Sequence, residues 1–348
     1  MREFSDMHVH MSEFNFDRGE AMLDIMADIG VKRAGLMSLT YRSVIYNLWL
    51  LYWKSVYKKM DLSVFGMIHP SGLYSDIPFE EQAKALIDMG CDGIKMMFAP
   101  GSRKRTGIGI DDPKYDKMFD YLEKNGIPVV AHVADPEEFW VPRELTDSER
   151  ERGWGYFNGG YHTKEELYEE TFRRLDRNPR LKITLAHFFF LSNFYDEAVR
   201  VMEKYPSVSF DLTPGWEMYL GFSKDIPKWR GFFERYSDRI FYGTDSNDTK
   251  SFISELNMHV RWALDKDCEF VMPFYPYPRV HGLGLSPEIA DKILNGNYIK
   301  YIAKPSPVDT DKLIAYAERV ISDLSALGKE NAESEIACLR GIIARLSA

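Results

Sequence analysis

The stretch Phe4-Ser5-Asp6-Met7-His8-Val9-His10 is a largely apolar run that ends in two histidines one residue apart. The run predicts a β-strand, and in a strand residues two apart point to the same face. His8 and His10 can therefore bind one ion together. Neutral imidazoles combined with a carboxylate suit zinc or a related divalent ion, so this first strand predicts part of a metal site.

Seven more candidate strands follow, and longer stretches with apolar residues at helical spacing separate them. This alternation is typical of βαβ units on a parallel sheet, and eight such units make a (β/α)8 barrel. A Rossmann-like open sheet would alternate in the same way, but no GxGxxG motif follows the first strand, so we favour the barrel. The eight candidate strands span residues 4–10, 33–39, 63–69, 93–97, 128–133, 182–187, 208–212 and 240–244.

Polar side chains end four of the later strands. Lys95 ends the fourth, His132 the fifth and His187 the sixth, and Asp245 closes the eighth. Because the carboxyl ends of all strands in a barrel meet at one rim, these side chains are expected near the two histidines of the first strand. A core role is the common explanation for a single histidine, but it does not explain all of them together. The rim is therefore the predicted active site.

Composition restricts the class of protein. The 348-residue chain has a formal net charge of −9, which argues against a general nucleic-acid binder and favours a small-molecule partner. Its three cysteines are scattered and form no CxxC pair, which favours a reducing cytoplasm. The start of the chain lacks a signal-peptide pattern, and no apolar stretch approaches the ~20 residues of a membrane span, so we predict no membrane segment.

The chain is expected to divide into a barrel over residues 1–304 and a C-terminal helical extension over residues 305–348 that packs on the barrel. After Lys304-Pro305 the apolar residues of 313–327 follow helical spacing, and Gly328 suits the end of a helix.

Two loops, 134–163 and 269–286, are long enough to predict lids or binding loops. The segments 46–57 and 274–277 are rich in aromatic residues and could bury apolar surface between copies of the chain. A homo-oligomer is therefore an open alternative.

These residues together resemble the amidohydrolase superfamily, and within it the amidohydrolase-related (amidohydrolase 2) branch of TIM-barrel metal-dependent hydrolases. The resemblance spans roughly residues 3 to 303 and implies a distorted barrel in which His8, His10 and Asp245 bind the metal, with His132 as a further ligand. The motifs that carry it, in order, are Asp6 to His10, Gly93-Ile94-Lys95, Pro128 to His132, Ala186-His187, Asp238 to Asp245 and Gly296-Asn297-Tyr298.

The resemblance leaves the roles of His187 and Lys95 open. His187 either binds a second metal ion or acts on the substrate as acid, base or electrophile, and we favour the second role. Lys95 matches a lysine that is carboxylated in two-metal relatives and bridges the ions. The histidine usual shortly after it is missing, because Met96-Met97-Phe98 follows. An ion pair inside the barrel mouth is an equal alternative for Lys95, so the site takes one or two ions.

The predicted function is hydrolysis of an amide, lactone or ester of a small molecule by metal-activated water. A divalent cation, zinc before manganese or iron, lowers the pKa of bound water toward ~7 and polarises a carbonyl group. Asp245 can orient that water and move its proton to the leaving group, while His187 or Lys95 stabilises the oxyanion.

Two other functions stay open. The first is a single-metal decarboxylase or hydratase, a lyase, of an aromatic-derived carboxylic acid. The second is a barrel that binds without catalysis. Carbon dioxide release would identify a decarboxylase, and a lack of bound metal would indicate the non-catalytic barrel.

His8→Ala should abolish tight metal binding and leave the fold largely intact, because it removes one imidazole from the predicted ligand set. Elemental analysis of the purified variant, with circular dichroism as the control for folding, measures both effects. A variant that retains stoichiometric metal would show that His8 is not a ligand.

Overall fold

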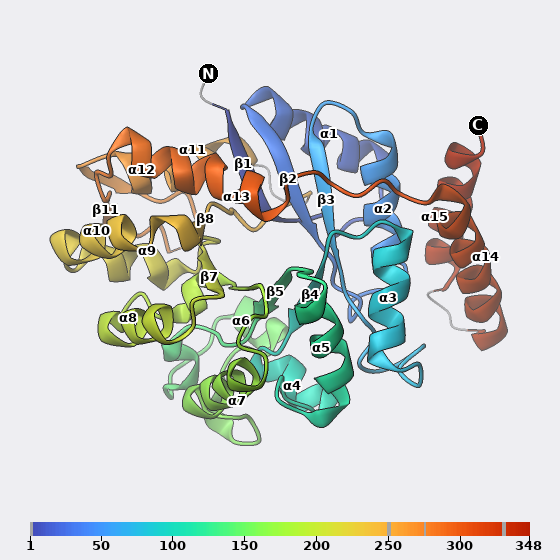
Figure 1. The fold of residues 1–348 in the computed structure, drawn as a ribbon, viewed down its shortest axis with the longest axis horizontal. Coiled ribbons are helices and arrows are strands. Elements are labelled where there is room, and N and C mark those ends of the chain that lie inside the picture. The colour runs from blue at the N-terminus through green and yellow to red at the C-terminus, as the bar shows by residue number, and fades with distance from the viewer. Residues whose placement is uncertain (1–2, 249–251, 275, 329–331) are drawn as a thin grey trace.

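One parallel sheet forms the centre of the computed structural model, which describes residues 3–248, 252–274, 276–328 and 332–348. Within those residues nine strands pair in the order β8-β7-β6-β5-β4-β3-β2-β1-β9, and helices lie around them (Figure 1). The strands are β1 (Phe4–His10), β2 (Val31–Met37), β3 (Asp61–Gly66), β4 (Gly93–Met97), β5 (Val129–His132), β6 (Ile183–Leu185), β7 (Val208–Asp211), β8 (Ile240–Phe241) and β9 (Ser246–Asn247).

The sheet closes through a broken eighth strand. β8 pairs with β7, and β9, which follows after four intervening residues, pairs with β1. Between them, the Met7 amide donates to the Tyr242 carbonyl oxygen at 3.0 Å, and the Asp245 amide donates to the His8 carbonyl oxygen at 2.9 Å. The predicted distorted (β/α)8 barrel is therefore confirmed, and the distortion lies where the eighth strand bends around residues 242–245.

Helices cover the outside of the barrel. The α-helices before the C-terminal pair are α1 (Phe16–Asp28), α2 (Tyr46–Val56), α3 (Phe79–Met89), α4 (Pro100–Thr106), α5 (Asp116–Lys124), α6 (Asp147–Arg152), α7 (Lys164–Arg177), α8 (Tyr195–Lys204), α9 (Trp216–Ser223), α10 (Ile226–Arg235), α11 (Ile253–Asp265), α12 (Pro287–Asp291) and α13 (Asn297–Tyr301). Short helical turns are η1 (Pro113–Tyr115), η2 (Glu137–Trp140), η3 (Tyr156–Asn158), η4 (His187–Phe190), η5 (Ser237–Arg239) and the π-helix η6 (Lys292–Gly296), and β10 (Glu269–Val271) pairs with β11 (Arg279–His281). None of the helices in the described ranges is long and apolar enough to cross a membrane.

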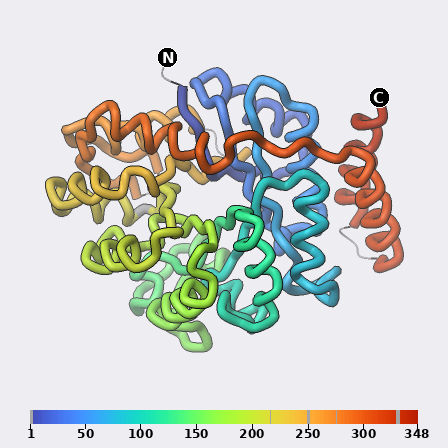
Figure 2. The backbone as a smooth tube through the Cα atoms, viewed as in Figure 1, coloured from blue at the N-terminus to red at the C-terminus, as the bar shows by residue number. Residues whose placement is uncertain are grey.

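A helix pair follows the barrel, as the sequence predicts. α14 (Thr310–Leu327) and α15 (Ala332–Leu346) pack against each other and contact α2, and Figure 2 shows the chain crossing from the barrel to this pair at one edge of the molecule. The Ser306 amide donates to Asp92 Oδ1 at 2.6 Å and fixes the crossing segment. The division into units 1–304 and 305–348 stays a prediction.

The aromatic segment 46–57 lies inside the chain. In α2 every residue from Tyr46 to Lys54 is buried, and Trp49 packs edge-on against Phe16 of α1 with ring centres 5.0 Å apart. α15 also contacts α2, and Arg345 of α15 lies 3.8 Å from the centre of the Phe16 ring. These side chains therefore contribute to the core of a single copy.

Gly35→Ala should destabilise the barrel by about 1–3 kcal/mol, because a Cβ at position 35 would lie 2.2 Å from the Met7 carbonyl oxygen where β2 meets β1. Thermal unfolding followed by circular dichroism measures the change. Gly231→Ala in α10 is the control, since a Cβ there meets no atom within 4 Å and alanine favours a helix. Equal melting temperatures for Gly35→Ala and the wild type would contradict this packing.

Candidate metal centre

The predicted site residues lie at the carboxyl ends of the barrel strands. They are His8 and His10 in β1, Lys95 in β4, His132 at the end of β5, His187 at the start of η4 and Asp245 between β8 and β9. The backbone φ angle is 57° at His187 and 52° at Asp245, in the left-handed region. Non-glycine residues are uncommon there, and such strained residues concentrate at functional sites.

Three of these side chains form a compact group of ligand atoms. His10 Nε2 lies 3.1 Å and His8 Nε2 4.0 Å from Asp245 Oδ1, and one ligand atom from each residue lies within 4.8 Å of the other two. Two imidazole nitrogens and a carboxylate oxygen are donors that zinc and related ions accept. The geometry of this group therefore suits a divalent ion.

A hydrogen-bond acceptor lies on the far side of each imidazole. His8 Nδ1 lies 2.9 Å from Asp211 Oδ2, and His10 Nδ1 lies 3.0 Å from the Met37 carbonyl oxygen. A carboxylate and a carbonyl only accept hydrogen bonds, so His8 Nδ1 donates and His8 Nε2 keeps a lone pair. His10 has an acceptor on both sides, because its Nε2 also lies 3.1 Å from Asp245 Oδ1, and the tautomer with the proton on Nδ1 is the one that leaves Nε2 free for a cation. The nitrogens that approach Asp245 are thus the ones able to bind a cation.

His132 and His187 have the same arrangement. His187 Nδ1 lies 3.1 Å from the Thr213 carbonyl oxygen and His132 Nε2 lies 3.2 Å from Asp135 Oδ1, so these two nitrogens donate. The other nitrogens, His187 Nε2 and His132 Nδ1, face each other at 3.2 Å as two lone pairs. A shared proton or a cation relieves their repulsion, and two nitrogen ligands of one tetrahedral zinc ion also lie roughly 3.4 Å apart.

Burial keeps three of the imidazoles neutral. It lowers the pKa of His8 to about 4, lowers the pKa of His10, and lowers the pKa of His187 well below its usual value. A metal ligand must be unprotonated, so these three imidazoles are in the binding form at neutral pH. Burial also lowers the pKa of Lys95 to about 8, and Lys95 Nζ lies 3.2 Å from His8 Nε2, beside the same group.

Asp211 is a site residue that the sequence analysis did not select. It ends β7, is fully buried and connects the two histidine groups, because Oδ2 accepts from His8 and Oδ1 accepts from the His187 amide at 2.8 Å. Burial alone would raise the pKa of Asp211, but His8, His187 and the Thr213 hydroxyl hold it below its usual value. A signal was present, since Asp211 is a polar residue at the end of a candidate strand, as Lys95 is.

The long loop after β5 reaches the site through Asp135. Asp135 Oδ1 contacts His132, and Oδ2 accepts a hydrogen bond from the Tyr156 hydroxyl at 2.6 Å. Tyr156 packs on Trp140 and Tyr161, with ring centres 4.9 and 4.8 Å apart. The loop therefore has an aromatic core of its own and is fixed to the rim by one carboxylate.

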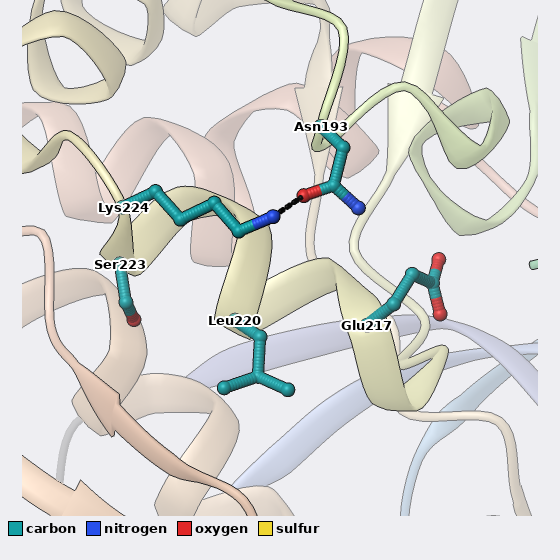
Figure 3. Close-up of a pocket in the computed structure, with 5 residues that line it drawn as sticks. All are labelled: Asn193, Glu217, Leu220, Ser223 and Lys224. Carbon is teal, nitrogen blue, oxygen red and sulfur yellow. Dashed lines mark hydrogen bonds between the residues drawn. The ribbon is translucent and has the colours of Figure 1, made fainter. Parts of the chain in front are cut away.

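A cavity of about 390 Å³ lies beside α9 (Figure 3). Its lining residues are Asn193, Glu217, Leu220, Ser223 and Lys224, and Lys224 Nζ donates to Asn193 Oδ1 at 2.7 Å. Burial raises the pKa of Glu217 to about 7. The lining includes none of the predicted metal ligands.

Comparison with known families identifies the chain. The sequence model of the amidohydrolase family matches residues 47–300, and the chain therefore belongs to the amidohydrolase family. No curated protein sequence matches it.

Solved structures share the fold at low sequence identity. Bb4693, an uncharacterized TIM-barrel protein from Bordetella bronchiseptica, is 16% identical, with 87% of this chain and 99% of that chain covered and a TM-score of 0.52. An amidohydrolase II is 13% identical over 87% of this chain and 100% of its own, with a TM-score of 0.56. The 4-oxalomesaconate hydratase of Rhodopseudomonas palustris is 13% identical over 92% and 99%, with a TM-score of 0.52. These similarities confirm the barrel fold.

Asp211→Asn should lower metal affinity about 10–100-fold with the fold retained, because an amide replaces the charged acceptor behind His8. Competition with a chromophoric chelator measures the affinity. Asp92→Asn is the matched control. Asp92 is a buried carboxylate that pairs with Lys54 just before β4, at the opposite end of the barrel, so the metal affinity of this variant should equal that of the wild type. Equal affinity in Asp211→Asn and the wild type would refute the positioning role.

Proposed function

We propose that this chain is a metal-dependent hydrolase that uses activated water to cleave an amide, lactone or ester of a small molecule. The observation that supports the proposal is the convergence of His8 Nε2, His10 Nε2 and Asp245 Oδ1, with an acceptor for Nδ1 behind each imidazole. These three residues would hold the divalent ion. Zinc suits imidazole and carboxylate donors best, and manganese and iron are alternatives.

Asp245 is the proposed general base. A bound divalent ion would lower the pKa of water toward about 7 and polarise a carbonyl group. Asp245 Oδ1 is the oxygen nearest both imidazoles, and its side chain is still 35% exposed, so a water molecule and a substrate can reach it. A base must lie within hydrogen-bond reach of the proton that it removes. The same carboxyl group can then return that proton to the leaving group.

Lys95 and His187 are the proposed contacts for the oxyanion. With a pKa of about 8, Lys95 is largely protonated at neutral pH, and a cation in a buried site stabilises developing negative charge. His187 can share a proton with His132 across 3.2 Å and donate it to the substrate. If the site takes two ions, this histidine pair would hold the second.

A single-metal lyase, a decarboxylase or hydratase of an aromatic-derived carboxylic acid, is the second candidate. Across residues 3–248, 252–274, 276–328 and 332–348, one group of three residues meets the spacing of a metal site. Met96-Met97-Phe98 also stands where a histidine would favour two ions. The fold is similar to that of 4-oxalomesaconate hydratase, which adds weight to this candidate.

Assays of the zinc-loaded and manganese-loaded protein against lactones, N-acyl compounds and carboxylic esters test the proposal. Chelator-sensitive acid release, followed by pH-stat titration, is the expected result. Release of carbon dioxide from an aromatic acid, or hydration of such an acid, without any hydrolysis would show that the protein is a lyase and not a hydrolase. Full metal occupancy without turnover on either panel would favour the non-catalytic barrel.

Asp245→Asn should lower kcat by about 10²–10⁴-fold, because an amide cannot act as the base, and should lower metal affinity much less, because its oxygen remains a ligand. Turnover and metal content are measured on the same preparation. Asp248→Asn is the control, since Asp248 accepts from the Ser12 and Glu13 amides and should keep its kcat. A wild-type rate in Asp245→Asn would show that the base is another group.

A further inference from the structure

Two arginines from different segments of the chain lie against one exposed tyrosine at the rim. Arg42 follows β2 and Arg105 lies in the last turn of α4, after β4, so both belong to the carboxyl ends of the strands. The guanidinium carbon of Arg42 lies 5.9 Å and that of Arg105 4.9 Å from the centre of the Tyr41 ring. Both guanidinium groups are therefore held beside the same ring.

The neighbouring cations of α4 differ in how they are neutralised. Arg103 pairs with Glu170: Nε and Nη2 each donate to Oε1 at 3.0 Å, and Nε also donates to Oε2 at 3.2 Å. Lys104 and Arg105 follow it directly and are exposed, and Lys104 Nζ lies 3.9 Å from the Tyr161 ring centre. In the described part of the chain, neither these two residues nor Arg42 has a carboxylate within 4.0 Å.

This cationic group lies at the same rim as the metal centre, because Arg42 follows β2 and Arg105 follows β4. Burial alone would lower the pKa of Arg42, but Tyr41, Tyr46 and Asp245 raise it, so the guanidinium group stays charged. The rim therefore carries a positive charge on the side of β2 and β4.

The charge of the whole chain makes this placement informative. A protein with a formal net charge of −9 repels anions in general, so an anionic ligand needs a local positive potential to approach. The contacts with Tyr41 hold the two guanidinium groups but leave their net charge in place. Guanidinium groups bind carboxylate and phosphate through paired N–H donors, which suits recognition of such a ligand.

We propose that the substrate is an anion, and that Arg42 and Arg105 bind its carboxylate or phosphate group while its reacting carbon lies beside Asp245. This inference rests on the proposed metal-dependent function for the position of the reacting carbon. The anion site itself consists of residues outside the metal ligands, so its occupancy can be measured without metal.

Isothermal titration calorimetry on the metal-depleted full chain tests the anion site, with inorganic phosphate and glutarate as separate probes. The wild type should bind at least one of them at one equivalent per chain, and the preferred probe distinguishes phosphate from carboxylate. Arg42→Ala and Arg105→Ala should each bind about tenfold more weakly. Arg235→Ala is the charge-matched control, because this exposed arginine pairs with Glu203 just before β8 at the opposite rim, and it should bind as the wild type does.

Two results would overturn the proposal. One is the absence of saturable binding of either probe to the wild type, and the other is wild-type affinity in the Arg42→Ala/Arg105→Ala double variant. Lys95→Met identifies the binding residue in the second case. If anion binding is lost in Lys95→Met and kept in the double variant, the anion binds Lys95. None of these outcomes depends on metal occupancy, so the hydrolase proposal stands or fails separately.

Discussion

The imidazoles of His8, His10, His132 and His187 each have a hydrogen-bond acceptor behind them, and this constraint governs the rest of the site. The pairs are His8 with Asp211, His10 with Met37, His187 with Thr213 and His132 with Asp135. Lone pairs are left on the inward nitrogens, next to the Asp245 carboxylate and next to each other. Such an arrangement of donors is unfavourable alone and favourable around a cation, so the hydrogen bonds behind the ligands prepare the site for metal.

The fold serves this arrangement through the broken eighth strand. Asp6, buried in β1, accepts from the Thr244 amide at 3.1 Å and from the Thr244 hydroxyl at 2.5 Å. The Asp245 amide donates to the His8 carbonyl oxygen, so the turn is held from both sides. These bonds keep Asp245 at a φ of 52° and place its carboxylate against His10. The same turn therefore closes the barrel and positions the site carboxylate.

Strand-end chemistry made much of the site predictable. The candidate strand 4–10 coincides with β1, and the polar residues that end candidate strands lie at one rim. The candidate strand 240–244 differs, because the chain breaks into β8 and β9 around Asp245, and periodicity carries no information about a left-handed residue. The acceptors behind the histidines were not predictable either, since a backbone carbonyl such as that of Met37 becomes a partner only through tertiary contact.

Packing context explains the remaining differences. The aromatic run 46–57 has the composition of an interface, but α15 covers it within the same chain. The length of loop 134–163 predicts a role at the rim, whereas its attachment to His132 through Asp135 depends on geometry alone. The local sequence therefore indicates which strand ends carry the site residues, and long-range hydrogen bonds decide which imidazole nitrogen faces the metal site.

Elemental analysis of the protein purified without added metal or chelator, and again after reconstitution, tests the central claim most directly. We expect at least one equivalent of a divalent metal per chain: one equivalent would assign the ion to His8, His10 and Asp245, and two would add the His132 and His187 pair. No bound metal after reconstitution of the folded protein would contradict the claim that these histidines converge to bind a cation.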